Sequence, residues 1–343
     1  MEIGIIGSSQ SGKSTIFQIM TGVNSINAHS EKYLKGVAKV PDTRFSTLVE
    51  IFNPAKATPA TIPFIDVNAS GKNAWNAIRQ SLNGVDGILH IVDGFTTSDL
   101  NEIVKNYQTL TDDLVLSDLM IIENRLERIK KTSPKSMGPS ELTQATILPK
   151  AQEILESGKR LKDLPMSDDE IASIRGFDFW TLRSELVVLN TSEDKSNIQN
   201  DFIEKTKLKI PVISICCQIE AEIASLSKDD QKDFLISMGI ETPAFEKIIK
   251  TAFSLLDQIS YFTVGEDEVK AWVIPSGSTA PRAAAAIHKD FERGFIKAEV
   301  VSYDDFIASG KTLGTAKSSG KLRLEGKDYI VKDGDIINFR FNV

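Results

Sequence analysis

Cysteine and histidine are scarce in this 343-residue chain, which holds two cysteines and three histidines. Cys216 and Cys217 are adjacent, and adjacent cysteines are poorly placed for a structural disulfide. His29, His90 and His288 lie far apart in the sequence and show no metal-ligand spacing. These features argue against a disulfide-stabilised secreted protein and against a metal centre built from histidine or cysteine.

Long apolar runs are missing as well. No stretch approaches the roughly 18 uninterrupted apolar residues that cross a bilayer, and the first residues enter an apolar run without a basic leader. Hydrophobic residues make up 41% of the chain and charged residues 25%, as in a globular protein in solution. The net charge of −7 argues against a chain that coats nucleic acid over its whole surface. We expect a cytoplasmic protein with no membrane contact.

A glycine-rich motif stands near the start of the chain. Residues 7–14 read Gly-Ser-Ser-Gln-Ser-Gly-Lys-Ser, between an apolar run at 3–6 and a helix-like segment from Thr15 onward. A strand, this loop and a helix together form the phosphate-binding arrangement of P-loop proteins, in which backbone N–H groups and the lysine contact phosphate oxygens. The residues that we expect to hold phosphate are Gly7, Gln10, Ser11, Gly12, Lys13, Ser14 and Thr15. The chain is therefore predicted to bind a nucleoside triphosphate or diphosphate.

A second part of such a site follows the apolar run at 62–65. Asp66 comes directly after it and can hold Mg²⁺ opposite the Ser14 hydroxyl. GTPases usually continue Asp-x-x-Gly at this point, but Ala69 replaces the glycine, and Ser70 stands where a water-orienting glutamine is often found. The substitutions predict slow or absent hydrolysis, and we assign no catalytic residue.

Recognition of the base is expected after two later strands. Guanine-specific proteins carry Asn-Lys-x-Asp here, whereas this chain reads Asn190-Thr191-Ser192-Glu193. Thr191 replaces the lysine, and the side chain of Glu193 is one methylene longer than that of aspartate. Both guanine and adenine therefore stay open, and Asn190 could alternatively cap a helix or turn. Cys216 and Cys217 would form a second base-contacting loop, with a buried strand end as the alternative.

Apolar runs that alternate with helix-like segments predict an α/β fold, a doubly wound parallel sheet with its ligand at the carboxyl ends of the strands. The series is interrupted at 113–178, where apolar residues at helical spacing flank a Pro- and Gly-containing break and predict an antiparallel helical hairpin or coiled-coil arm. Short strands and one helix then indicate a small α+β domain at 260–343, in which Phe341 is expected to be core. The nucleotide-binding domain would comprise 1–112 and 179–258.

Taken together, these segments resemble the YchF family of Obg-related P-loop NTPases. The most specific similarity lies in the last 85 or so residues, at Ala280-Pro281-Arg282, His288-Lys289-Asp290-Phe291-Glu292-Arg293-Gly294 and Phe339-Arg340-Phe341-Asn342-Val343. Further similarity extends along the whole chain and includes Val40-Pro41-Asp42 and Asn53-Pro54. The resemblance implies a C-terminal TGS domain of β-grasp fold, binding and hydrolysis of ATP or GTP with Mg²⁺, and association with ribosomes.

The resemblance also shows where this chain departs from its family. Ser30 falls near the family's switch threonine, and the segment around Gly94 to Asp99 is too short for us to assign the histidine that the family is thought to use in hydrolysis. The departures concentrate in the nucleotide site, which indicates a divergent member.

The hairpin suggests a partner. Its first half ends in a basic cluster with one acidic residue inside it, and the basic residues are Arg125, Arg128, Lys130, Lys131 and Lys135. The cluster could reach rRNA phosphates, or it could equally be a solvated helix face. The favoured function is a slow ATPase or GTPase acting with the ribosome or RNA. The alternative is a catalytically degenerate nucleotide-binding or nucleotide-free interaction module. A small-molecule kinase is disfavoured, because no arginine-rich lid is found.

Overall fold

The computed structural model describes residues 1–24, 33–67, 74–193 and 198–342. Its contacts divide the chain into two units, of which the first comprises Met1–Gly36 and Phe64–Phe245 and the second Val37–Pro63 and Glu246–Val343. Residues 37–63 thus group with the C-terminal part of the chain. The domain limits suggested by the sequence stay a proposal.

A six-stranded sheet carries the phosphate loop. Its strand order is β2-β4-β1-β5-β6-β7, with every pairing from β4 to β7 parallel. The strands are β1 (Ile3–Gly7), β2 (Tyr33–Lys39), β4 (Thr61–Val67), β5 (Gly87–Gly94), β6 (Ser184–Thr191) and β7 (Val212–Ile215). After β1 the chain first forms β2 and β4 on one side of β1 and then β5 on its other side. The loop after β1 therefore lies at a topological switch point, where α/β sheets bind ligands.

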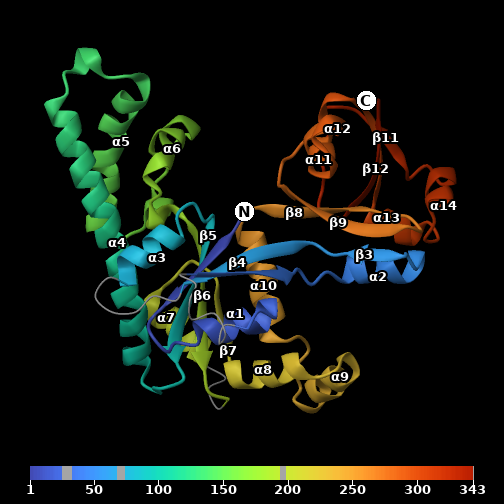
Figure 1. Cartoon of the computed structure of the whole chain (residues 1–343), viewed down its shortest axis with the longest axis horizontal. Coiled ribbons are helices and arrows are strands. Elements are labelled where there is room, and N and C mark those ends of the chain that lie inside the picture. The colour runs from blue at the N-terminus through green and yellow to red at the C-terminus, as the bar shows by residue number, and fades with distance from the viewer. Residues whose placement is uncertain (25–32, 68–73, 194–197, 343) are drawn as a thin grey trace. The chain divides into compact units, whose positions relative to one another are not determined.

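Helices cover both faces of this sheet. The side chains of β5 alternate between the two faces, and both kinds are buried, since Ile88 and Leu89 are each almost inaccessible. The covering helices are α1 (Lys13–Thr21), α3 (Ala74–Ser81), α4 (Leu100–Lys131), α7 (Ile198–Thr206) and α8 (Cys217–Ser225), followed in the chain by α9 (Lys228–Ser237) (Figure 1). The predicted α/β P-loop fold is confirmed.

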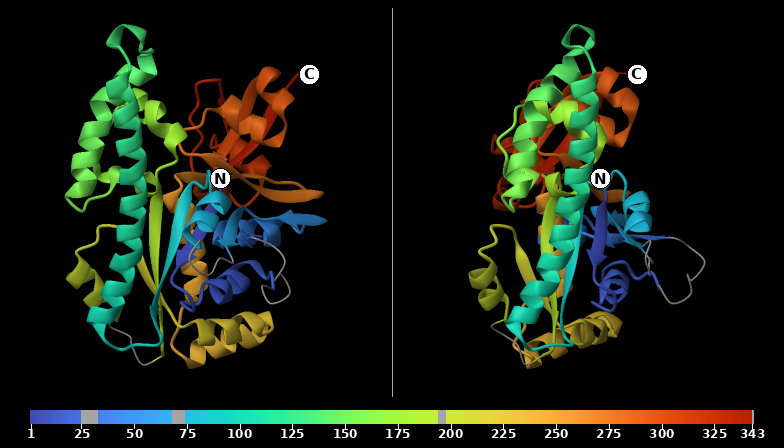
Figure 2. Two further views of the ribbon diagram at one scale, coloured as in Figure 1. Left: turned by 60° about the vertical axis from the view of Figure 1, so that its left-hand side comes forward. Right: turned by 90° about the vertical axis from the view of Figure 1, so that its left-hand side faces the viewer.

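The first helix of the predicted arm is continuous with a helix that packs on the sheet. Helix α4 is 32 residues long and begins at Leu100, because its first turns pack Ile103, Val104 and Tyr107 against β6 and α7 before the helix leaves the sheet. Its second half runs beside α5 (Pro139–Glu156), which returns along it (Figure 2). Buried residues between them include Ile122, Ile147, Leu148 and Ala151. The hairpin is therefore a continuation of a sheet-covering helix.

After α5 the chain returns to the sheet through one short helix and three 3-10 turns, which are α6 (Asp168–Ile174), η2 (Leu161–Asp163), η3 (Arg175–Phe177) and η4 (Trp180–Leu182). Two buried carboxylates fix this return. Asp118 on α4 accepts hydrogen bonds from the backbone N–H groups of Trp180 and Thr181, at 3.0 and 2.8 Å. Glu185 on β6 binds His90 Nδ1 at 2.9 Å and the guanidinium of Arg160 at 2.9 Å. The base of the arm is thus held by buried polar contacts.

The second unit contains a mixed sheet of order β11-β10-β12-β8-β9-β3. Helix α11 (Ala280–Ile287) covers one face with Ala283 and Ala284, against a core that includes Tyr261 and Phe339. The strands are β3 (Lys56–Thr58), β8 (Gln258–Thr263), β9 (Glu268–Pro275), β10 (Phe295–Ser302), β11 (Arg323–Glu325) and β12 (Asp335–Phe341). The remaining helices are α2 (Thr43–Phe52), α10 (Ala244–Leu255), α12 (Lys289–Arg293), α13 (Tyr303–Ala308) and α14 (Leu313–Ser318).

One expectation about this core is wrong. Phe295 is buried, as expected, but Phe341 is 41% exposed and stacks on Phe291, with ring centroids 3.6 Å apart. Phe341 follows the last residues that pack under α11, so its ring lies at the margin of the core.

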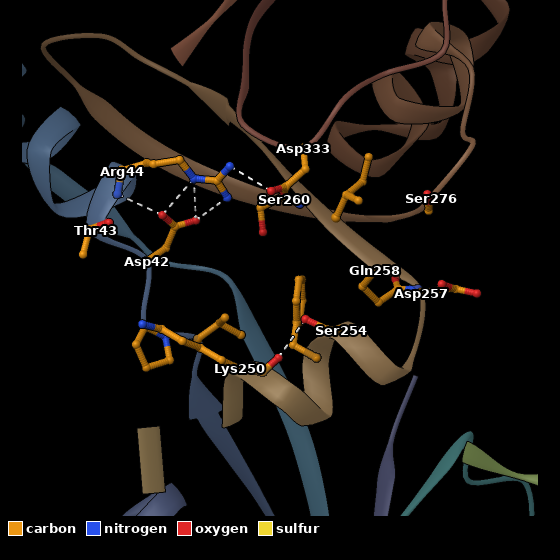
Figure 3. Close-up of a pocket in the computed structure, with 14 residues that line it drawn as sticks. Asp42, Thr43, Arg44, Lys250, Ser254, Asp257, Gln258, Ser260, Ser276 and Asp333 are labelled. Atoms are coloured by element: carbon orange, nitrogen blue, oxygen red, sulfur yellow. Dashed lines mark hydrogen bonds and ion pairs between the residues drawn. The ribbon is translucent and has the colours of Figure 1, made fainter. Parts of the chain in front are cut away.

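A polar pocket of about 450 Å³ lies within the second unit (Figure 3). The guanidinium of Arg44 binds Asp42 through three hydrogen bonds and Asp333 through one of 2.8 Å. These two carboxylates raise the pKa of Arg44 further above its ordinary value. The contacts hold α2 to the turn before β12, and together with the pairing of β3 with β9 they join residues 37–63 to this unit.

In the part of the chain that the structure describes, no helix has the length and apolarity to cross a bilayer.

Candidate nucleotide-binding site

The loop between β1 and α1 has the backbone that its glycines suggest. A Cβ at Gly7 would lie 2.4 Å from the carbonyl oxygen of Ile91, and a Cβ at Gly12 would lie 2.5 Å from Asn190 Nδ2. Gly12 also has φ 97°, which side chains rarely adopt. Both glycines are therefore required by close packing, and α1 begins directly after the second one.

Lys13 lies against the loop that it is predicted to serve. Its ammonium donates to the carbonyl oxygens of Gly7 and Ser8, at 3.1 and 2.6 Å. Burial lowers the pKa of Lys13, and the negative charge of Asp66 partly offsets that effect. The ammonium is thus held inside the loop, where phosphate oxygens would meet it.

Ser14 and Asp66 are brought together as predicted. The Ser14 hydroxyl donates to Asp66 Oδ2 at 2.8 Å, although the two residues are 52 positions apart in the chain. Burial raises the pKa of Asp66, while the Ser14 hydrogen bond and the Lys13 charge act in the opposite direction. The second carboxylate oxygen of Asp66 is buried and accepts no hydrogen bond from a described residue.

The Ser14 hydroxyl oxygen and the Asp66 carboxylate suit Mg²⁺. Magnesium prefers hard oxygen ligands and usually takes only one or two from protein, completing its octahedron with phosphate and water. The described residues contain no group of three or more histidine, cysteine, aspartate or glutamate side chains that could hold a metal by themselves. Ser14 and Asp66 would hold the ion together with a nucleotide, whose phosphate charge it would neutralise.

Asn190 connects two loops. It lies at the end of β6 and is buried, with Nδ2 donating to the carbonyl oxygen of Ser11 at 3.1 Å and Oδ1 accepting from the backbone N–H of Cys217 at 3.3 Å. Asn190 therefore positions the phosphate loop against the start of α8. The sequence placed Asn190 at the base site but did not predict this contact with Ser11, whose own hydroxyl is buried without a described partner.

The other predicted base-site residues surround Asn190. Glu193 is exposed shortly after β6, where its carboxylate is accessible to a ligand. Cys216 is half-buried and precedes α8, whereas Cys217 is buried, which raises the pKa of its thiol to about 12. The raised pKa keeps the Cys217 thiol uncharged at neutral pH. The backbone N–H of Cys217 already donates to Asn190 and is not available to a base.

Some predicted residues cannot be placed. Ser30, Ala69 and Ser70 lie outside the described residues. Two residues predicted to hold phosphate are exposed: Gln10, which has φ 64°, and Thr15, which lies on α1. At the end of β5, Asp93 accepts hydrogen bonds from the backbone of Phe95 and Thr96 and thereby closes the shortened segment as a tight turn.

Comparison with known proteins agrees with this geometry. Residues 2–125 match a family described as 50S ribosome-binding GTPase, and residues 258–342 match the YchF C-terminal family, described as a protein of unknown function (DUF933). The chain is 36% identical over 361 residues to the ribosome-binding ATPase YchF of Haemophilus ducreyi, with 99% of each chain covered. The chain belongs to the YchF family.

Other YchF proteins show a similar likeness. The ribosome-binding ATPase YchF of Bacillus subtilis is 34% identical over 363 residues, with 99% of both chains covered. A solved structure of the Schizosaccharomyces pombe YchF GTPase has the same fold, with a TM-score of 0.86 at 24% identity over 99% of this chain and 97% of that one. The YchF fold thus extends over the whole chain.

Proposed function

We propose that this YchF-family chain binds a nucleoside triphosphate together with Mg²⁺ and hydrolyses it slowly, as a cytoplasmic protein that acts with the ribosome. The observation that carries the proposal is the hydrogen bond between Ser14 and Asp66 beside Lys13, since it joins the phosphate loop to a second magnesium ligand. The names of the relatives support the same activity, because YchF of H. ducreyi and of B. subtilis are both called ribosome-binding ATPases.

ATP is the proposed substrate in preference to GTP. Glu193 takes the place of the aspartate that reads guanine, and its longer side chain displaces the carboxylate from the guanine N1 and N2 donors. Adenine would be read by backbone groups near Cys216. The Asn190 side chain serves this site by holding the phosphate loop against the start of α8.

The proposed ribosomal contact lies at the tip of the arm. The Arg125 guanidinium is already bound to Glu141 and Gln144, at 2.9 and 2.8 Å, so this member of the basic cluster acts within the arm. The cluster's other four cations are exposed, namely Arg128, Lys130, Lys131 and Lys135. We propose that they contact rRNA phosphates, which a cluster of exposed cations favours. A TGS-type β-grasp domain in the C-terminal part would be the second proposed contact.

Calorimetric titration of the nucleotide-stripped protein tests the nucleotide-binding part of the proposal. Non-hydrolysable ATP and GTP analogues would each be titrated with Mg²⁺, followed by phosphate release under saturating nucleotide with and without ribosomes. Tighter binding of the ATP analogue and measurable release support the proposal. Binding without release in either condition would exclude hydrolysis and leave a nucleotide sensor.

A second candidate is an interaction module that has lost turnover. The substitution of Ala69 and Ser70 in the segment after Asp66 favours it, because the usual glycine and glutamine are both missing. Binding without release would favour its nucleotide-binding form, and absence of binding to both analogues would overturn the nucleotide-binding proposal and favour its nucleotide-free form.

Cosedimentation with ribosomes tests the arm separately. Changing Lys130 and Lys131 together to Glu should reduce cosedimentation and flatten its dependence on salt, since fewer counterions are released. The matched control changes two exposed lysines elsewhere on the first unit, Lys105 and Lys209, to Glu. Equal loss in both double variants would show that only net charge matters.

A further inference from the structure

Strand β12 of the second unit is paired unequally on its two sides. Toward β10 it is paired along its length, from Ser302 opposite Asp335 to Phe295 opposite Phe341. Toward β8 the parallel pairing is confined to Ile336 opposite Phe262. Strand β8 ends one residue later, whereas β12 continues for five residues. In the described part of this sheet, β8 therefore reaches only as far as Ile337, and no strand lies beside residues 338–341 on that side.

A strand edge of this kind presents unused backbone groups. Along a β-strand, successive N–H and C=O groups point alternately to the two neighbouring positions. Those that point to β10 are used in the ladder, and those that point the other way past Ile337 have no strand partner among the described residues. Such a row is a template for another extended chain.

A pocket of about 510 Å³ lies along this same edge. Phe339 and Phe341 line it from one face of β12, and Asn338 and Ile336 line it from the opposite face. Successive side chains of a strand point to opposite faces, so one pocket can be lined by both sets only where it runs along the edge of the strand. The pocket is therefore a groove at the unpaired edge.

We propose that this groove binds an extended segment of a partner protein, which adds to the sheet as a strand beside residues 338–341. Addition of a strand uses the unpaired backbone groups for affinity and the pockets on either face for alternate side chains. Further lining residues form the pockets for side chains: Val264, Ile287, Phe291, Leu313 and Leu322 are apolar, and Thr263 and Lys317 are polar.

The lining predicts the chemistry of the segment. On the side of Phe291 and Phe341, whose rings are stacked, the groove would receive apolar side chains at every second position. On the other side Glu299 is engaged by Asn338 and Arg340, while Lys317 is exposed. An acidic or polar residue is therefore expected on that side of the bound strand.

Selection from a phage-displayed library of random peptides of about ten residues, on the immobilised full-length chain, tests the proposal. The expected result is enrichment of sequences with apolar residues at alternate positions. The enriched peptide would then be synthesised in two N-methylated forms, one methylated at the odd positions and one at the even positions. Only the form that blocks the N–H groups facing β12 should lose binding.

Two variants locate the binding site. Phe341→Asp should weaken the enriched peptide by about tenfold or more, as loss of a central aromatic contact does. Leu324→Asp is the matched control, because Leu324 is 59% exposed on β11, at the outer edge of the same sheet. This variant should bind the peptide as the unaltered chain does. Amide hydrogen exchange of the unaltered protein should slow at Asn338 to Phe341 when the peptide is added.

Several outcomes would overturn the proposal. They are the absence of any enriched peptide, equal tolerance of both N-methylated forms, and exchange that does not slow at this strand. If sedimentation velocity shows a dimer that Phe341→Asp abolishes, the edge would be assigned to a second copy of the chain instead. Protection of Asn338 to Phe341 by a single-stranded oligouridylate, with no effect of peptide, would assign the groove to RNA.

Discussion

The side chain of Asn190 lies between the phosphate loop and the first turn of α8, with its Nδ2 3.1 Å from the Ser11 carbonyl oxygen. Its Oδ1 accepts from the Cys217 N–H, so a single buried side chain fixes two loops from distant parts of the sequence. A buried amide in this position stabilises both loops, because each would otherwise have an unsatisfied backbone group.

Asn190→Ala should therefore lower both stability and nucleotide affinity. We expect the free energy of unfolding to fall by about 1–3 kcal/mol, the usual cost of leaving buried hydrogen-bonding groups unpaired. Urea unfolding and calorimetric titration measure the two effects. The control is Asn83→Ala, at an exposed position of the same unit, which should behave as the unaltered chain. Unchanged stability in Asn190→Ala would show that the amide does not hold the loops.

Lys13→Ala should remove nucleotide binding while leaving the fold intact. Among the described residues, the Lys13 ammonium donates to two loop carbonyls and feels the charge of Asp66, whereas a triphosphate would present it with several negative charges. Loss of about 2 kcal/mol or more corresponds to at least about thirtyfold weaker binding. Calorimetry with a non-hydrolysable ATP analogue gives the affinity, and Lys105→Ala on α4 serves as the control. An affinity equal to that of the unaltered chain would refute the site.

The phosphate loop and Asp66 could be predicted because each follows an apolar run directly, and parallel strands deliver their ends to one edge. Strand β3 could not, since Lys56 to Thr58 has no apolar pattern and its partner Glu268 lies more than 200 positions away in the chain. The start of α4 at Leu100 is also not visible in the sequence, because one helix serves two cores. Tyr107 belongs to the sheet core and Ile122 to the arm, and one uninterrupted helix joins them.

The buried group formed by His90, Glu185 and Arg160 should make stability depend on pH. Burial alone would raise the pKa of Glu185, but the hydrogen bond from His90 and the charge of Arg160 outweigh it and lower that pKa. A carboxyl whose pKa is lower in the folded state contributes stability above its unfolded pKa, near 4.3, and loses that contribution as the pH falls through its folded value. The chain should therefore be destabilised in acid.

Urea unfolding at neutral pH and at about pH 4 measures this dependence. Glu185→Gln keeps the size of the side chain but removes the charge, so this variant should be less stable at neutral pH and should lose less stability on acidification. The control Glu153→Gln changes an exposed residue of the arm and should follow the unaltered chain. Equal acid sensitivity in all three proteins would show that Glu185 does not cause it.

Ala69→Gly should raise turnover. Strand β4 delivers the Asp66 carboxylate to the Ser14 hydroxyl, so the magnesium side of the site is in place, and the nearest departure from hydrolytic relatives is the alanine three positions further on. Glycine would give that position the backbone freedom with which such loops respond to the γ-phosphate. Phosphate release at saturating Mg-ATP should increase several-fold while affinity for the non-hydrolysable analogue changes little, and Ala55→Gly, outside the site, should have no effect. If Ala69→Gly brings no gain, the cause of slow hydrolysis lies elsewhere, and the tight turn that Asp93 closes after β5 becomes the next segment to restore.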